Sequence, residues 1–243
     1  MASDPGVDTV PQRWATAISA LTPAPSENWV TPFLGMLPTA GMSVSTLGAV
    51  FANETLIASD GVADRLDELQ FDLGEGPCWD SVNRRLPVFE PNMPGNGSHA
   101  WPALSEAVLA DGVHGVFAFP LLLGPIGVGA IDLYALDKCS LSVGEVARMQ
   151  ALAAAVTRLV LRRAIVRAEE PMESELENPH SRRVVHQATG AVIAQLGIPA
   201  ADALLVLQGR AFAEGRPVRA VAEDVIAKRM VFTRQQDGIE DTP

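Results

Sequence analysis

Apolar and polar positions follow two different periods along the first 168 residues, and together these periods predict both helices and strands. Apolar residues at spacings of three and four predict amphipathic helices, whereas short apolar or alternating runs predict strands. Two apolar runs, at 113–123 and 126–135, flank the turn signal Gly124-Pro125 and predict a central antiparallel hairpin. The other predicted strands are 43–51, 55–58 and 87–90, the predicted helices are 11–21, 27–37, 62–69, 78–85 and 101–110, and 91–98 is a predicted loop.

These elements predict an α+β fold with an antiparallel sheet flanked by helices. The repeating strand–helix–strand units that a parallel sheet requires are missing from the pattern. A long helical pattern closes this part of the chain, starting near Ser142 with Glu145 at the third helical position. Its apolar residues recur over about 25 residues, longer than a typical globular helix, so we expect it to project and to pair with a second copy.

The segment 180–232 has only helical patterns and predicts a small three-helix bundle. Gly197 and Gly215 mark helix ends, and Pro199 and Pro217 mark helix starts. At about 50 residues such a bundle is close to the lower limit of independent stability, so dimerisation would support it. The expected inward residues are Val184, Ala188, Val192, Leu196, Ala203, Leu204, Leu207, Ala211, Val218, Val221, Ala222, Val225 and Ile226.

An acidic segment bracketed by two prolines separates the two parts, and this composition is typical of a linker. The acidic end of the chain predicts a disordered tail. The predicted organisation is therefore a tail and helix at 1–24, an α+β domain at 25–168, a linker at 169–179, a helical bundle at 180–232 and a tail at 233–243.

Composition and charge exclude some classes of protein and bear on whether the chain binds nucleic acid. The chain has 243 residues, 48 % hydrophobic and 19 % charged, which excludes a disordered or fibrous protein. Its net charge of −11 argues against nucleic acid as a partner of the whole chain. Residues 180–236, however, hold eight basic and four acidic side chains, and such a charge asymmetry indicates a nucleic-acid contact in the basic part.

Cysteine usage and the first residues predict a cytoplasmic protein. Cys78 and Cys139 are 61 positions apart and offer neither a disulfide framework nor a zinc knuckle, so a reducing compartment fits. The first ten residues lack the basic start and apolar run of a secretory signal. The uncharged stretch 112–131 has about the length of a membrane span, but Gly124-Pro125 divides it, so we expect a buried hairpin and no membrane.

Signatures of catalysis and metal binding are missing from the sequence. It has no P-loop, no Gly-x-Ser-x-Gly and no His-Glu-x-x-His, and the glycines of 124–129 fit a hairpin better than a dinucleotide site. The histidines show no ligand spacing; they are His99, His114, His180 and His186. We therefore expect no enzyme activity, no cofactor and no metal.

Two features leave alternatives open. The glycine-rich run 73–78, with Trp101-Pro102 downstream, is either a ligand pocket or a structural turn, and Cys78 is either a reactive thiol at a helix start or a buried apolar side chain. The expected pocket residues are Gly74, Glu75, Cys78, Trp101 and Phe117. The basic residues of the last segment either contact phosphates or form a solvated helical face.

Residues 181–232 resemble the ANTAR domain, a three-helix RNA-binding module of bacterial transcription antitermination regulators. The resemblance rests on the run from Arg182 to Ala191, which includes Gln187-Ala188 and Gly190, and on Gln195-Leu196-Gly197, Ala203, Arg210-Ala211-Phe212, and Val221-Ala222 with Val225. Residues 25–165 resemble a GAF sensor domain of the subtype fused to ANTAR domains, on the evidence of Leu73–Cys78, Trp101-Pro102 and Phe119-Pro120-Leu121. Together the two resemblances cover nearly the whole chain.

The resemblance implies a regulator whose ANTAR domain, as a homodimer, binds RNA stem-loops while the GAF domain senses a small molecule or redox state. Cations would contact phosphates, and amide or hydroxyl groups would contact bases. The expected RNA-binding residues are Arg182, Arg183, His186, Gln187, Thr189, Gly190, Arg210 and Arg219. Thr189 stands where many ANTAR domains have a lysine.

Two other functions remain open for the bundle. One is dimerisation or protein docking, which the modest positive charge and Thr189 favour. A DNA-binding helix-turn-helix is also compatible with the three-helix spacing. The third predicted helix offers few side chains for reading bases, since Arg219, Glu223, Asp224 and Lys228 mix signs on its outer face.

Overall fold

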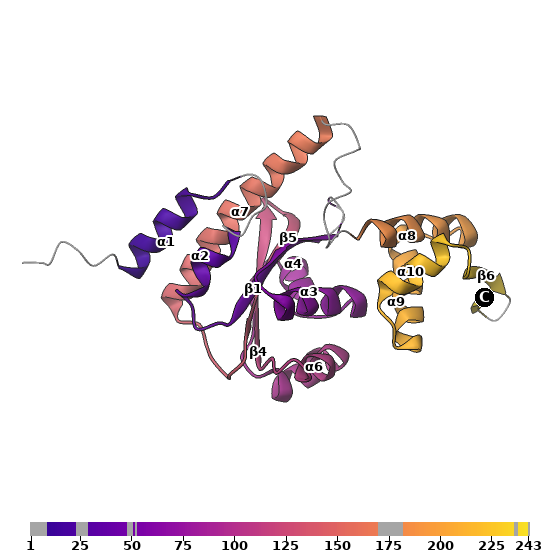
Figure 1. Cartoon of the computed structure of the whole chain (residues 1–243), viewed down its shortest axis with the longest axis horizontal. Helices are drawn as coiled ribbons and strands as arrows, with labels where there is room; N and C mark the ends of the chain where they lie inside the picture. The colour runs from indigo at the N-terminus through magenta and orange to yellow at the C-terminus, as the bar shows by residue number, and fades with distance from the viewer. Residues whose placement is uncertain are drawn as a thin grey trace, which may run out of the picture.

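A computed structural model describes residues 9–22, 29–47, 51, 53–169, 182–235 and 238–242. Its centre is a five-stranded antiparallel sheet in the order β2-β1-β5-β4-β3 (Figure 1). The strands are β1 (Gly41–Thr46), β2 (Glu54–Ala58), β3 (Val88–Glu90), β4 (Gly115–Leu123) and β5 (Ile126–Ala135). The α+β prediction is confirmed, and β4 and β5 form the predicted hairpin, with Gly124 at φ 57° in its turn.

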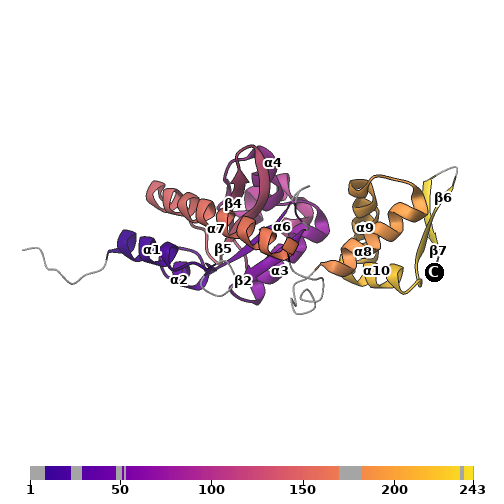
Figure 2. The same cartoon turned by 90° about the horizontal axis from the view of Figure 1, so that it is seen from above.

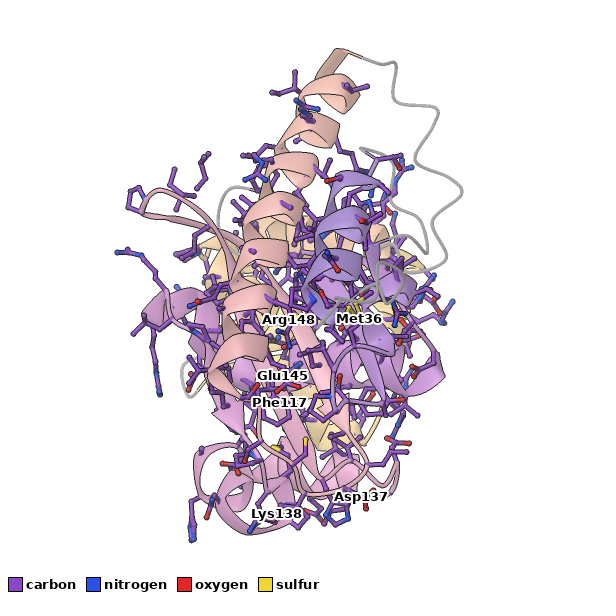
Figure 3. The ribbon with its side chains drawn as sticks, turned by 90° about the vertical axis from the view of Figure 1, so that its left-hand side faces the viewer. Met36, Phe117, Asp137, Lys138, Glu145 and Arg148 are labelled. Carbon is purple, nitrogen blue, oxygen red and sulfur yellow. The ribbon has the colours of Figure 1, made fainter. Side chains whose placement is uncertain are left out.

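One face of the sheet carries the large apolar core. The helices α1 (Val10–Ser19), α2 (Thr31–Leu34) and α7 (Val143–Glu169) cover this face, and Figure 3, which looks onto it, shows α7 in front of Phe117 from β4. Trp14 and Phe33 pack edge to face with ring centroids 4.7 Å apart, which joins α1 to α2. The long helix that the sequence predicts from Ser142 onwards is present as α7.

The opposite face carries α3 (Gly61–Leu73), α4 (Pro77–Arg84) and α6 (Pro102–Leu109). Asp60 begins α3, because its Oδ1 accepts from the backbone N–H groups of Val62 and Ala63 at 2.9 Å. The helix runs four residues beyond the predicted end at residue 69. The predicted loop at 91–98 is partly helical, with a π-helical turn at Met93–Gly97 followed by α5 (Ser98–Ala100).

The C-terminal segment folds as the predicted three helices, α8 (Arg183–Leu196), α9 (Ala200–Glu214) and α10 (Val218–Ile226) (Figure 2). Gly197 and Gly215 end α8 and α9 in the left-handed conformation. The inward positions shift slightly at the helix ends: Val185 is buried where Val184 was expected, and Ile226 is 43 % exposed. Leu204 is half-buried.

The prediction of a disordered tail at 233–243 is wrong for most of that segment. Strands β6 (Val231–Gln235) and β7 (Gly238–Thr242) pair in an antiparallel ladder. Phe232 supplies the reason, because its side chain is buried in the core of the three helices and fixes the start of β6. The acidic composition of this segment predicts disorder, but its structure depends on this one buried apolar side chain.

Several other predictions concern segments outside the described residues, including nearly all of the linker at 169–179 and the first eight residues. Within the described segments no individual helix combines the length and apolarity that crossing a bilayer requires. Helices α8 and α9 meet those criteria only when they are taken together, and they are bent by 106° at their junction.

Candidate nucleic-acid interface

Three of the residues predicted to bind RNA lie on one exposed stripe of α8. Arg183, Gln187 and Gly190 follow at spacings of four and three, which places them along one side of the helix. A Cβ added at Gly190 would meet no atom within 4 Å, so the packing of the protein itself does not require glycine there. The stripe therefore combines a cation, an amide and a position at which a partner can approach the backbone closely.

His186 and Thr189 are also on α8 but make contacts within the protein. His186 is exposed, and its Nε2 lies 3.1 Å from the carbonyl oxygen of Asn53 in the segment before β2. The Thr189 hydroxyl donates to the Val185 carbonyl at 2.8 Å, one turn earlier in the same helix. In this conformation, the Thr189 hydroxyl proton is thus committed to its own helix.

Most of the basic side chains of α9 and α10 face carboxylates of the same bundle. Arg210 pairs with Glu214 at 2.6 Å, and Arg219 lies 3.6 Å from Glu223. Arg216 connects Glu214 to Asp224, at 2.8 and 2.7 Å, and Arg229 also approaches Asp224 at 2.7 Å. These hydrogen bonds lower the pKa of Asp224. The positive charge of the bundle is therefore partly neutralised on α9 and α10, away from the stripe on α8.

Arg182, which is also among the predicted RNA-binding residues, is only 8 % exposed in this structure. Its Nη2 lies 2.8 Å from Asp67 Oδ2 on α3, and its guanidinium carbon lies 4.1 Å from the ring centroid of Phe71. The ion pair and the cation–π contact together explain why an arginine is stable in a nearly dry position. As the structure stands, Arg182 binds the α+β domain.

Hydrogen bonds from two strands of the sheet hold the Asp67 carboxylate in position for this contact. The hydroxyls of Ser45 on β1 and Thr55 on β2 each donate to one of its carboxylate oxygens at 2.5 Å. Asp67 is 2 % exposed, so the carboxylate has few alternatives to these partners. The carboxylate that accepts from Arg182 is therefore fixed by α3, which carries it, and by β1 and β2, which donate to it.

Further contacts join the bundle to α3, which lies on the side of the sheet that faces the bundle in Figures 1 and 2. Gln208 Nε2 donates to the Phe71 carbonyl at 2.6 Å, and the Val218 N–H donates to Asp72 Oδ2 at 3.1 Å. Phe71 itself belongs to the core of the bundle. The interface between the bundle and α3 was not predicted from the sequence. The sign of it in the sequence is that apolar residues continue to Leu73, beyond the predicted end of this helix at residue 69.

The five residues predicted to form a ligand pocket do not share one environment. Phe117 lies in the core on the α7 face of the sheet, whereas Trp101 lies in a separate cluster with Leu104 on the opposite face. Glu75 Oε1 accepts the backbone N–H of Leu104 in the first turn of α6 at 2.9 Å. Gly74 ends α3 at φ 64°. The glycine-rich run is in these respects a structural turn.

Cys78 is a buried member of that run. Its side chain packs with Leu47 and Ala130, and it is 2 % exposed. Burial first, and then the charges of Asp132 and Asp67, raise the pKa of its thiol. These surroundings suppress the thiolate and match the interpretation of Cys78 as a buried apolar side chain.

A buried carboxylate on β5 is the most unusual polar group of the α+β domain. Asp132 is 1 % exposed, and the buried side-chain amide of Gln70 on α3 is the neighbour whose interaction lowers its pKa. Burial, followed by the charge of Asp67, raises its pKa well above the usual range. Its cross-strand neighbour Ser43 is also buried with an unpartnered hydroxyl in the described structure.

A cleft of about 320 Å³ lies where α3 meets the joint between α9 and α10. Charged side chains of both signs line it, including Arg65, Asp72 and Arg216, together with the exposed ring of Phe212. Among the described residues no group of three or more His, Cys, Asp or Glu side chains is gathered to hold a metal ion.

Comparison with known proteins agrees with this division of the chain. The ANTAR domain family model matches residues 177–226, which include α8, α9 and α10. The chain is similar to the GAF domain of a phosphoenolpyruvate-protein phosphotransferase from Coxiella burnetii, with 16 % identity and a TM-score of 0.50, over 65 % of this chain and 95 % of that one. A search of curated proteins found no match.

Two further solved structures align with a similar share of this chain at lower TM-scores. A domain of a two-component sensor histidine kinase protein from Sinorhizobium meliloti aligns with 14 % identity and a TM-score of 0.46, over 67 % of this chain and 98 % of that one. The GAF domain of a sensor histidine kinase from Bacillus halodurans aligns with 10 % identity and a TM-score of 0.42, over 66 % and 99 %. The sheet order, its flanking helices and the C-terminal match together give this chain a GAF-ANTAR architecture.

Proposed function

We propose that this chain is an RNA-binding transcription antitermination regulator, which couples a signal sensed by its GAF domain to the binding of RNA stem-loops by its ANTAR domain. The observation that carries the proposal is the position of the ANTAR match, which includes the three helices and their exposed stripe of Arg183, Gln187 and Gly190. A cation for phosphates beside an amide for base edges is the combination that recognition of an RNA loop needs.

The sensing half of the proposal is supported by the polar groups buried under α3 and α4. Ser43 Oγ is buried without a hydrogen-bond partner among the described residues, and its cross-strand neighbour Asp132 has only the Gln70 amide beside it. A small polar ligand that enters this face would supply further partners to both groups. The proposal assigns the chain no catalytic activity, no cofactor and no metal. Because the target is a nascent transcript, it places the protein in the bacterial cytoplasm.

The homodimer in this proposal is supported by α7. Near its C-terminal end this helix exposes two neighbouring apolar side chains, Ile165 at 63 % and Val166 at 51 %. Pairing with a second copy would bury them and bring two ANTAR domains together. Replacing both by glutamate is expected to convert a dimer to a monomer in light-scattering measurements, and an unchanged mass would exclude this part of α7 from the dimer.

Transcription through a terminator tests the function directly. The template carries a leader in which a stem-loop pair overlaps an intrinsic terminator, and bacterial RNA polymerase transcribes it with and without the protein. The proposal predicts more readthrough with the wild-type chain and less with Arg183→Ala. The matched control, Arg84→Ala, removes an exposed cation of the α+β domain and is expected to behave as wild type.

A second function is favoured by the contacts between the bundle and α3. The burial of Arg182 and Phe71 at this junction also fits a bundle that serves protein docking. A docking bundle predicts no change in readthrough at any protein concentration. Readthrough that depends on Arg183 excludes it as the main role.

A further inference from the structure

The contact between Arg182 and α3 excludes other uses of the same side chain. The guanidinium is 8 % exposed, paired with Asp67 and stacked on Phe71. Its Nη1 has no hydrogen-bond partner within the described residues. A guanidinium bonds an RNA phosphate through these same N–H groups, and the phosphate would have to enter a position that Asp67 and Phe71 already fill.

A second contact occupies the neighbouring part of the predicted RNA surface. The side chain of His186, which is one turn further along α8, lies with its Nε2 3.1 Å from the Asn53 carbonyl of the GAF domain. Arg182 and His186 are therefore both engaged by the GAF domain at the N-terminal end of α8. The stripe of Arg183, Gln187 and Gly190 on the same helix is exposed.

We propose that α3 of the GAF domain is an internal competitor of RNA, which holds Arg182 and the N-terminal end of α8 in a docked, autoinhibited state. This inference rests on the proposed function and names its regulation. RNA binds the undocked ANTAR domain, so the apparent dissociation constant equals the intrinsic one divided by the undocked fraction. Anything that weakens docking then strengthens RNA binding without changing the RNA-binding surface.

The contact between Asp67 and Arg182 is coupled to the sheet of the GAF domain through hydrogen bonds. Asp67 receives hydroxyl hydrogen bonds from Ser45 on β1 and Thr55 on β2, and Ser43 and Asp132 face each other across β1 and β5 on the same side of the sheet. A ligand or a protonation change that moves β1 at this point would move the acceptor of Arg182. The regulatory signal therefore has a short physical route from the buried polar groups to the ANTAR domain.

RNA affinity of the full-length chain provides the first test. Asp67→Asn keeps the shape of the side chain but removes the charge that holds Arg182, so Arg182 leaves the interface and the ANTAR surface is unaltered. We expect the apparent dissociation constant for a pool of stem-loop RNAs to fall by about tenfold or more. Adding Arg182→Ala to this variant should reverse much of the gain.

Asp80→Asn is the matched control. It makes the same aspartate-to-asparagine change, but it breaks an ion pair with Arg84 that lies within α4. It should leave the RNA affinity unchanged. If Asp67→Asn binds RNA no more tightly than wild type and Asp80→Asn, the competition does not exist.

A distance measurement makes the test independent of RNA affinity. Spin labels at Glu106→Cys on α6 and Ala201→Cys on α9, in a Cys139→Ser background, report the separation of the two domains, since both positions are exposed. We expect one narrow distribution in the wild type and a broader, longer one in Asp67→Asn. Added RNA should shift the wild type in the same direction.

The two readouts separate the possible failures. If the domains separate in Asp67→Asn but neither protein binds RNA, the proposed function fails and the docking contact stands. If RNA binds and the distance distribution of the wild type does not change, RNA does not compete with α3 and the inference is overturned. An unchanged distribution in Asp67→Asn overturns the role of Asp67 itself.

Discussion

The backbone N–H of Phe232 donates to Gln195 Oε1 at 2.9 Å, so the first strand after the three helices is tied to α8. The Phe232 ring is 3 % exposed within the bundle core. The small ANTAR domain therefore gains apolar area from the hairpin that follows it, which a domain of this size needs for stability.

This relationship predicts a stability cost for changes at either end of the contact, including Phe232, which lies outside the family match. Phe232→Ala should lower the free energy of unfolding of the ANTAR domain by about 3–5 kcal/mol, and Gln195→Ala by about 1 kcal/mol, because one removes a buried ring and the other a hydrogen bond. Urea denaturation monitored by circular dichroism measures both. Thr233→Ala, at an exposed position of the same strand, is the control. Equal stability of Phe232→Ala and this control would show that the hairpin does not support the bundle.

Gly129 is a point of close approach between β1 and β5. Thr46 is its partner on β1, and a Cβ at Gly129 would collide with the Ser45 carbonyl oxygen. Gly129→Ala is therefore expected to destabilise the GAF domain by about 1–3 kcal/mol, since backbone cannot move aside as a flexible side chain can. Gly61→Ala is the control, because a Cβ there meets nothing within 4 Å. Thermal unfolding of the two variants compares them, and similar melting temperatures would contradict the predicted collision.

Asp72 predicts a pH dependence of stability. Burial raises its pKa from the ordinary 3.8 to about 6, with a further increase from Glu68, while the Val218 N–H and Arg182 oppose the change. Arg65 on the same helix and Arg216 at the joint between α9 and α10 line the same cleft as Asp72. The folded, docked state therefore holds the proton more tightly than the unfolded chain, and this contribution to stability is complete below pH 3.8 and lost as the pH rises through 6.

Comparison with Asp72→Asn measures that contribution. Asparagine keeps an acceptor for Val218 and carries no charge, so the free energy of unfolding of wild type should fall by about 2–3 kcal/mol relative to this variant between pH 4 and pH 7. Chemical denaturation at four pH values across this range gives the difference. A constant difference across the range would mean that Asp72 titrates at its ordinary value.

Cys78 and Cys139 should differ sharply in reactivity. Burial raises the pKa of both thiols, but Cys78 is only 2 % exposed, whereas Cys139 is half-buried and a reagent can reach it. A thiol-specific chromogenic reagent at pH 8 should therefore modify one thiol in the folded protein and two after unfolding. The Cys139→Ser variant should show almost no reaction while folded. Rapid modification of this variant would restore the interpretation of Cys78 as a reactive thiol.

Local patterns were sufficient for most of the elements. The β4–β5 hairpin follows from two apolar runs around Gly124-Pro125, and α8 and α9 end at the predicted glycines, because turns and caps are set by neighbouring residues. The charge of 233–243 predicts a disordered tail, but the buried ring of Phe232, just before it, determines the structure of this segment.

The candidate site depends on contacts that the sequence pattern does not contain. Arg183 and Gln187 are exposed because they fall on the outer side of a helix whose inner positions are apolar, and this follows from periodicity. Arg182 is one residue earlier but pairs with Asp67, 115 positions away in the chain. No local rule distinguishes an arginine that faces solvent from one that meets a buried carboxylate of another domain.

The most direct test of the account is the salt dependence of RNA binding. The wild type, Asp67→Asn and their Arg183→Ala versions are titrated with a pool of stem-loop RNAs and with the matching duplex DNA at several salt concentrations. The account predicts selective RNA binding that weakens with salt, with a log–log slope reduced by about one when Arg183 is removed. Equal binding of RNA and DNA, or binding of neither by wild type and Asp67→Asn, would contradict the assignment of this protein as an RNA-binding regulator.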